Sequence, residues 1–254
     1  MSNDVAYKKS RIVRMISHRK VADVDDGHGT GFFVAEDGKL LTCFHVVFGQ
    51  ELRQIRNNPN FTAIAGSDEH SRLKEFYATT VSTLQVELPN RATVEAELLE
   101  FNEQYDIAAL KLKDDRRVEF FELAPDDDLD YDDAVFFCGY QFVYGYSPHQ
   151  YPFAVNSGRV ASFPDIIVGG ERYQHIQVSS VNLRGNSGAP LFRAGSNAVV
   201  GVVNGHMYWG SDNLACVDDS GGSMKINKGT LQIPLSITFA THLKTIQKNT
   251  HILN

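Results

Sequence analysis

Short apolar runs, separated by glycine, proline and acidic turns, recur along most of the chain. The run at residues 29–34 is joined to the next, 39–43, through the turn Glu36-Asp37-Gly38. Two apolar runs linked by a short glycine-containing loop predict a β-hairpin. The other predicted strands lie at 11–17, 81–88, 92–101, 106–112, 134–139, 154–163, 175–178, 189–192 and 199–203.

Three segments depart from this strand pattern. Residues 44–49 have the length of one helical turn and end on glycine. Residues 50–80 are polar, with apolar positions at roughly helical spacing, which predicts an insertion carrying one or two short helices. Residues Ser236 to Asn249 have an apolar residue at every third position, which predicts a final helix.

The fold class follows from how these elements are ordered. Many short strands without alternating strand–helix units indicate an all-β barrel or sandwich. A chain of 254 residues that is 43% hydrophobic and 22% charged is expected to form a packed core. The length fits one large domain or two small fused ones.

Composition and charge exclude several classes of function. The net charge of −7, without a basic patch, argues against nucleic-acid binding. No apolar run approaches the roughly 18 residues of a membrane-spanning helix. The polar first 20 residues lack the apolar core of a secretory signal. We therefore expect a cytoplasmic protein that binds neither nucleic acid nor membrane.

The cysteines and acidic runs do not suggest a metal or cofactor. Cys43, Cys138 and Cys216 are far apart and lack metal-ligand spacing, which is typical of reduced thiols in a cytoplasmic protein. The acidic runs 23–26 and 126–133 lack the ligand spacing of a calcium loop. We expect neither a metal nor a cofactor.

The strongest chemical signal is a serine between glycines, in the run Asn182-Leu183-Arg184-Gly185-Asn186-Ser187-Gly188-Ala189-Pro190-Leu191. A serine hydroxyl becomes nucleophilic when a base takes its proton, and the resulting oxyanion needs backbone N–H donors. Flanking glycines allow a tight turn in which consecutive amides point at one spot. The N–H groups of Gly185 and Ser187 are the predicted oxyanion-hole donors.

Two further segments supply residues that suit the same chemistry. His45 lies in the run Leu41-Thr42-Cys43-Phe44-His45-Val46-Val47, directly after the predicted hairpin. Asp106 begins an apolar strand, where a carboxylate needs a partner, and a histidine ring N–H would provide one. Taken singly, the serine turn, the histidine and the aspartate each have an ordinary structural explanation.

In order and context the three segments resemble the chymotrypsin-fold serine peptidases, most closely the protease domain of the HtrA/Deg family. That family has a Thr-Gly-aliphatic hairpin, a Leu-Thr-x-x-His-Val-Val box, Asp-(Ile/Leu)-Ala-x-Leu-Lys-Val and Gly-Asn-Ser-Gly-Gly-Pro-Leu. Further similarities are Val155-Asn156-Ser157-Gly158-Arg159-Val160 and Gln232-Ile233-Pro234-Leu235-Ser236. The resemblance extends from about Gly29 to Lys248.

The resemblance implies two six-stranded antiparallel β-barrels with a C-terminal helix. The N-terminal barrel, residues 1–125, would carry His45 and Asp106, and the C-terminal barrel, residues 126–254, would carry Ser187. It implies a serine endopeptidase in which Ser187 is the nucleophile, His45 the general base and Asp106 the group that orients the histidine. Protein or peptide substrates are expected, together with a protein partner that activates the enzyme.

Some features depart from the family pattern. Ala189 replaces the usual second glycine, and the 50–80 insertion lengthens the His45–Asp106 separation. We expect this insertion to lie beside the active-site mouth, where it gates access or docks a partner. No PDZ domain is expected after the final helix.

Control and specificity also follow from the resemblance. Asn186 stands where secreted trypsins carry an aspartate that pairs with a newly cut N-terminus, so control by ordering of the loops 183–184 and 207–228 is expected, with Gly221-Gly222 as hinge points. Val181 corresponds to the base of the primary specificity pocket, which favours small or medium apolar P1 residues. Asn204 and His206 correspond to the pocket wall.

Two other interpretations compete with this one. An α/β-hydrolase using Ser187, Asp212 and His242 would need Gly-x-Ser-x-Gly at a strand-to-helix turn, but position 189 is alanine and Pro190 follows it. A catalytically silent trypsin-like binding module would retain the pocket without turnover.

Overall fold

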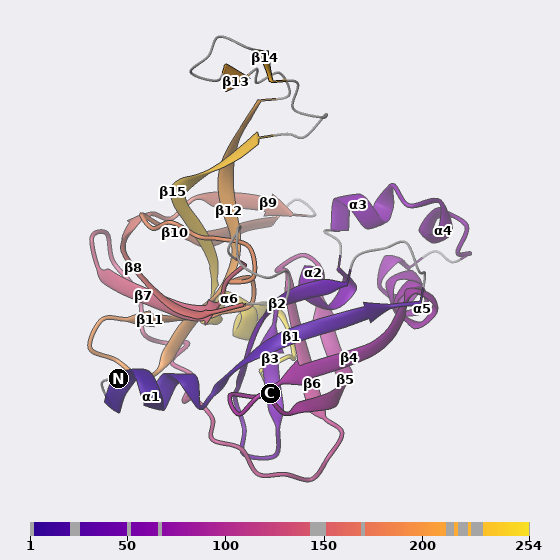
Figure 1. Cartoon of the computed structure of the whole chain (residues 1–254), viewed down its shortest axis with the longest axis horizontal. Coiled ribbons are helices and arrows are strands. Elements are labelled where there is room, and N and C mark those ends of the chain that lie inside the picture. Colours follow the sequence, from indigo (N-terminus) through magenta and orange to yellow (C-terminus); the bar gives the residue numbers. More distant parts are fainter. Residues whose placement is uncertain are drawn as a thin grey trace.

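The structure of the chain is a computed structural model. Two β-barrels, one after the other in the sequence, make up most of the molecule (Figure 1). None of the described helices is long and apolar enough to cross a membrane. The described residues are 3–20, 26–49, 52–65, 68–142, 151–168, 171–211, 216–217, 223–224 and 231–253.

The first barrel closes six antiparallel strands in the order β1-β2-β3-β6-β5-β4. Its strands have the alternation of half-buried β-structure: in β5, Val94 and Ala96 are buried while Glu95 and Glu97 are exposed. The predicted hairpin is confirmed, because Phe32 pairs with Leu41. The strands are β1 (Ile12–Arg19), β2 (Gly27–Phe33), β3 (Lys39–Thr42), β4 (Val81–Glu87), β5 (Thr93–Asn102) and β6 (Ile107–Leu112).

The second barrel closes in the order β7-β8-β10-β15-β12-β11, and β9 adds to β10 as a seventh strand. Beyond the barrel, β12 and β15 continue as a two-stranded ribbon (Figure 1). The strands are β7 (Ala134–Tyr140), β8 (Phe153–Ser162), β9 (Asp165–Val168), β10 (Glu171–Val178), β11 (Pro190–Arg193), β12 (Val199–Ser211) and β15 (Leu231–His242), with a short pair formed by β13 (Cys216–Val217) and β14 (Ser223–Met224).

These two barrels confirm the predicted all-β fold of two six-stranded antiparallel barrels. The α/β-hydrolase alternative is wrong, since that fold requires a parallel sheet and every pairing between named strands here is antiparallel. The strands of each barrel fall on opposite sides of residue 125. A division into domains at 1–125 and 126–254 stays a prediction.

The insertion between β3 and β4 contains three helices after the one-turn helix α2 (Phe44–Phe48), not the one or two predicted: α3 (Leu52–Arg56), α4 (Pro59–Thr62) and α5 (Glu69–Thr80). Helices α4 and α5 each begin at an N-cap residue of their own. The side chain of Asn58 accepts the N–H of Asn60, and that of Asp68 accepts the N–H groups of His70 and Ser71. Buried apolar residues join the insertion to the core of the first barrel: Ile55, Phe61, Leu73 and Phe76.

The predicted final helix is wrong over its first half. Residues 236–242 belong to β15, and only α6 (Leu243–Asn249) is helical. Apolar residues at every third position are compatible with either structure over so short a run. The choice is made by partners distant in sequence, because β15 pairs with β10 and β12 and closes the second barrel. A helix at the N-terminus, α1 (Asn3–Lys9), was not predicted.

Helix α6 begins at a histidine that caps it in the neutral form. The Nδ1 of His242 accepts the N–H of Lys244 at 3.0 Å, and its Nε2 lies 3.2 Å from the carbonyl oxygen of Asp127. A neutral ring with its proton on Nε2 satisfies both contacts. Burial lowers the pKa of His242 below its ordinary value. Protonation of Nδ1 would remove the cap.

We therefore expect acid to destabilise this helix and His242→Asn to reduce the effect. Because the folded-state pKa is lowered, the unfolded chain binds more protons, and stability is lost as the pH falls below about 6.5. Asparagine caps without titrating. The wild-type melting temperature should fall between pH 7.5 and 5.5 by roughly 2–4 °C more than that of His242→Asn. The pKa of His175 is also lowered by burial, but His175 is present in both proteins and cancels. Equal falls in both proteins would contradict the prediction.

Candidate active site

His45 is presented by the one-turn helix α2. Every other residue of this helix is buried, whereas the His45 side chain is 23% exposed. Phe44 and Phe48 lie one turn apart and stack with their ring centroids 4.1 Å apart, and both rings contact Phe101 of β5. Gly49, with a φ of 62°, ends the helix in the left-handed conformation that glycine favours. The helix is thus held on its apolar side and leaves the imidazole facing out.

Strand register brings Asp106 to this helix. Strands β3 and β6 are antiparallel, with Thr42 opposite Ala108. Continuing the pairing past both strand ends places the start of α2 beside Asp106. His45 and Asp106 are 61 positions apart in the sequence, and the chain between them runs through the insertion, β4 and β5 before it returns to His45.

Both carboxylate oxygens of Asp106 contact His45. Oδ1 accepts the backbone N–H of His45 at 2.9 Å, and Oδ2 lies 2.7 Å from Nδ1 of the ring. Because a carboxylate only accepts hydrogen bonds, Nδ1 must carry the proton, and Nε2 is then the ring nitrogen with the basic lone pair. The predicted partnership between this aspartate and this histidine is present in the geometry.

The loop that carries Ser187 runs from β10 to β11 and lies against the start of α2. Gly188 donates its N–H to the carbonyl oxygen of Val203 at 2.7 Å, and the Cys43 thiol donates to the same oxygen at 3.3 Å. A Cβ on Gly188 would lie only 3.1 Å from the Cys43 nitrogen. Since Cys43 is the N-cap of α2, the serine loop and the histidine helix are in contact.

Thr30 of β2 joins the serine loop to the first barrel, and sequence reasoning did not single it out. Its N–H donates to the carbonyl oxygen of Ser187 at 2.8 Å, and its hydroxyl donates to that of Gly185 at 2.7 Å. A Cβ on Gly188 would lie 2.0 Å from the Thr30 carbonyl oxygen, so this approach requires glycine. The sequence feature that could have identified Thr30 is its place between Gly29 and Gly31 in the hairpin.

The predicted oxyanion-hole donors lie in a tight turn. Gly185 has a φ of 96°, and a Cβ there would lie 2.3 Å from the carbonyl oxygen of Tyr140. Among the residues that the structure describes, neither the N–H of Gly185 nor that of Ser187 donates to another backbone group. The assignment of these two N–H groups as the oxyanion-hole donors stays a prediction.

Asn186, which precedes Ser187 in the sequence, is fully buried, and its side chain binds that of Asn182. Its Nδ2 donates to Oδ1 of Asn182 at 2.9 Å, and Nδ2 of Asn182 donates to the carbonyl oxygen of Gly205 at 3.2 Å. The turn preceding Ser187 is therefore held by neutral side chains. Control by loop ordering, without a newly cut N-terminus, stays a prediction.

The predicted specificity residues receive less support from the geometry. Val181 is 45% exposed, and Asn204 donates its amide to the hydroxyl of Thr241 at 2.8 Å. His206 lies on β12 opposite Thr238, and its side chain is outside the described residues. Roles for Val181, Asn204 and His206 in substrate binding stay predictions.

The predicted control loops are described in part. The backbone of residues 207–211 belongs to β12 and is strand, not loop. The rest of the 207–228 segment, apart from β13 and β14, lies outside the described residues, as does Gly221-Gly222. Asp212 of the α/β-hydrolase alternative is outside them as well.

One group of metal-ligating residues occurs in the described part of the chain. Ligand atoms of Cys43, His45 and Asp106 lie within 4.8 Å of one another. Burial, and then the charge of nearby Asp106, raise the pKa of the Cys43 thiol, which keeps it uncharged at neutral pH. Because His45 and Asp106 bind each other, the three residues form a hydrogen-bonded pair beside a buried thiol.

Comparisons with known proteins give similarities to serine proteases. A probable periplasmic serine endoprotease, DegP-like, of Rhizobium meliloti is 27% identical over 209 residues, which cover 82% of this chain and 31% of that protein. Two structures of the HtrA-type protease AlgW with tripeptide each have a TM-score of 0.60 at 18% identity, covering 97% of this chain and 61% of theirs. The Rv3671c protease from M. tuberculosis, in its active form, has a TM-score of 0.60 at 17% identity, covering 97% and 82%.

These similarities differ in what they establish. At such identities the solved structures establish the fold alone. The chain spans about a third of the DegP-like relative and less than two thirds of the AlgW chains. The family model of the trypsin-like peptidase domain matches residues 29–202, well over half of the chain, and the chain therefore belongs to the trypsin-like peptidase domain family.

Proposed function

We propose that this chain is a serine endopeptidase that cleaves protein substrates through an acyl-enzyme on Ser187. The observation that carries the proposal is the 2.7 Å contact between Asp106 and Nδ1 of His45, made beside the serine loop. This contact fixes the ring tautomer that a general base requires. Membership of the peptidase family supports the same reaction class.

Each group has a defined part in the proposed reaction. Nε2 of His45 takes the proton of the Ser187 hydroxyl as its oxygen attacks a peptide carbonyl carbon. The N–H groups of Gly185 and Ser187 stabilise the oxyanion, and loss of one such donor typically costs 10²–10³ in rate. The histidine then protonates the leaving amine, and Asp106 stabilises the imidazolium in between. Water, activated by the same histidine, releases the acyl group.

The substrate class follows from the residue at the predicted pocket base. Val181 offers an apolar side chain where trypsin-like enzymes with basic specificity carry an acid. We propose small or medium apolar P1 residues. We also propose that the enzyme is activated by ordering of the loops around Ser187 or by a protein partner. The proposed location is the cytoplasm. The two described free cysteines, Cys43 and Cys138, are buried thiols, which is compatible with a reducing compartment.

Cleavage-site profiling on a mixed peptide library tests activity and specificity together. Wild type is expected to cut after small or medium apolar residues. Val181→Asp, which places an acid at the pocket base, is expected to shift the preference toward Lys and Arg by roughly tenfold. Binding of peptides without any cleavage, with candidate partners present, would favour the silent binding module. Cleavage with an unchanged P1 preference in Val181→Asp would remove Val181 from the pocket.

A further inference from the structure

Asp106 occupies a backbone conformation that its surroundings must hold. Its φ of 53° lies in the left-handed region, which aspartate adopts more readily than most residues but which remains uncommon. Such a residue persists where neighbouring groups fix it. Because both of its carboxylate oxygens contact His45, a rotation of this backbone would separate the two side chains.

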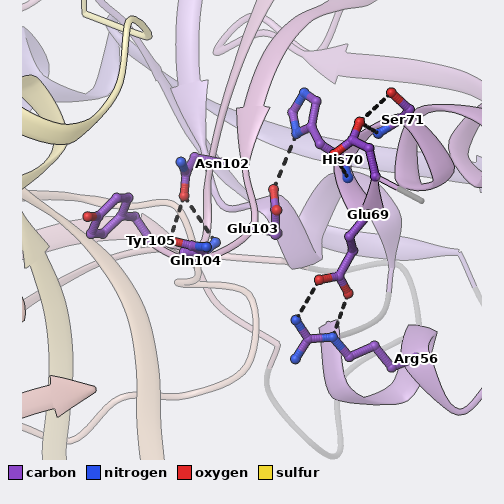
Figure 2. Close-up of polar contacts among 9 residues, drawn as sticks. Arg56, Glu69, His70, Ser71, Asn102, Glu103, Gln104 and Tyr105 are labelled. Atoms are coloured by element: carbon purple, nitrogen blue, oxygen red, sulfur yellow. Dashed lines mark hydrogen bonds and ion pairs between the residues drawn. The ribbon is translucent and has the colours of Figure 1, made fainter. Parts of the chain in front are cut away.

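Asn102 fixes the turn that leads into Asp106. It is the last residue of β5 and pairs with Ile107, the first residue of β6. Its side-chain Oδ1 accepts the N–H groups of Gln104 and Tyr105, both at 3.0 Å (Figure 2). This is the pattern by which asparagine side chains close short turns. One amide oxygen therefore holds the two residues that immediately precede Asp106.

The second barrel holds the other side of the same turn. The ring of Tyr105 is buried and meets Tyr173 of β10 edge to face, with centroids 4.7 Å apart. The hydroxyl of Thr241 in β15 donates to the Tyr105 carbonyl oxygen at 3.3 Å. Tyr105 is thus restrained at its N–H by Asn102 and at its carbonyl by the neighbouring barrel, which leaves Asp106 little freedom.

Helix α5 of the insertion is attached to this turn as well. Nδ1 of His70 lies 3.4 Å from the Glu103 carboxylate, and the His70 ring stacks on Phe101 with centroids 4.4 Å apart. Figure 2 shows α3 joined to the start of α5 through the two contacts between Arg56 and Glu69, at 2.6 and 2.8 Å. The turn before Asp106 is therefore where the insertion, the first barrel and the second barrel meet.

We propose that Asn102 is a positioning residue for the reaction: its side-chain oxygen sets the backbone of residues 104–106 and so places the Asp106 carboxylate on His45. The proposal rests on the proposed function, in which this carboxylate orients the general base. Asn102 contacts neither substrate nor reacting atoms. Its effect should appear in turnover, with little change in substrate binding.

The chain offers a matched control at the other end of the β4–β5 hairpin. There the side chain of Asn90 accepts the N–H of Ala92 at 3.1 Å, and Arg91 beside it has a φ of 69°. Asn90→Ala thus removes the same kind of turn contact, next to a residue of the same backbone conformation. It does so on an exposed turn away from the described site.

The experiment compares Asn102→Ala, Asn102→Asp and Asn90→Ala with wild type. Asn102→Ala is expected to lower kcat by roughly ten- to a hundredfold with KM nearly unchanged, the scale of a small misplacement of a catalytic group. It should also shift or broaden the downfield proton resonance of the His45 Nδ1–H in NMR spectra. Asn102→Asp keeps the accepting oxygen and should restore both. Asn90→Ala should match wild type in both.

The outcomes separate this proposal from the proposed function. Wild-type kcat and resonance in Asn102→Ala would overturn the positioning role, and so would an equal loss of kcat in Asn90→Ala. If wild type itself fails to cleave, the proposed function fails, while the resonance still reports whether Asn102 places Asp106 on His45. If Asn102→Ala does not fold, Asn102→Ser, which keeps a shorter acceptor, should show an intermediate kcat, and a wild-type value would contradict the proposal.

Discussion

Ser187→Ala is expected to abolish covalent labelling by a fluorophosphonate and to reduce peptide hydrolysis by about 10⁶-fold, to the limit of detection. The hydroxyl oxygen forms the acyl bond in the proposed mechanism, and alanine removes it. The loop should keep its shape, because Ser187 takes part in its described contacts through the backbone, and the other contacts are made by the glycines and asparagines around it. The measurements are labelling followed on a gel, kcat/KM on a cleaved peptide and the melting temperature.

The control for this variant is Ser157→Ala, which removes an exposed serine hydroxyl on β8 of the same barrel. It should label and cleave as wild type does. Labelling that survives in Ser187→Ala would assign the nucleophile to another residue. A lost signal combined with a melting temperature many degrees lower would report unfolding, so both variants are first required to melt within a few degrees of wild type.

Asp106→Asn is expected to lower kcat by about 10⁴-fold while leaving the fold intact. Asparagine has the same shape and tolerates the left-handed backbone at this position. Its NH2 group, facing Nδ1, would donate to the ring and force the imidazole proton onto Nε2. The histidine could then no longer accept the serine proton. Steady-state kinetics and the NMR resonance of the Nδ1 proton, which should disappear, measure the effect.

Asp132 provides the matched control for this change. It is an exposed aspartate with a φ of 65°, and its carboxylate pairs with Arg159 at 3.2 Å on the surface of the second barrel. Asp132→Asn makes the same chemical change in the same backbone conformation and should leave kcat unchanged. Near-wild-type turnover in Asp106→Asn would remove Asp106 from the mechanism, even with its contact to His45 intact.

The sequence predicted an element correctly where residues within one short segment determine its conformation. The glycines at 185 and 188 indicated a tight turn, and the structure gives the reason at Gly188, where a side chain would collide with Thr30. The hairpin of β2 and β3 was likewise predicted from its turn and its apolar runs. Residues 236–242 were predicted wrongly, because β15 is a strand only through its pairing with β10 and β12.

By itself the sequence determined the residue types of the candidate site, their order and the kind of fold that would hold them. Only the tertiary structure decided which side chains meet: the register of β3 with β6 places Asp106 at His45, and Thr30 attaches the serine loop to the first barrel. Neither Thr30 nor Asn102 stands out in the chain, since each acts through hydrogen bonds to backbone groups, which leave no mark on the partner's residue type. Strand pairing across many residues sets such contacts, and a local pattern of apolar and polar positions does not contain them.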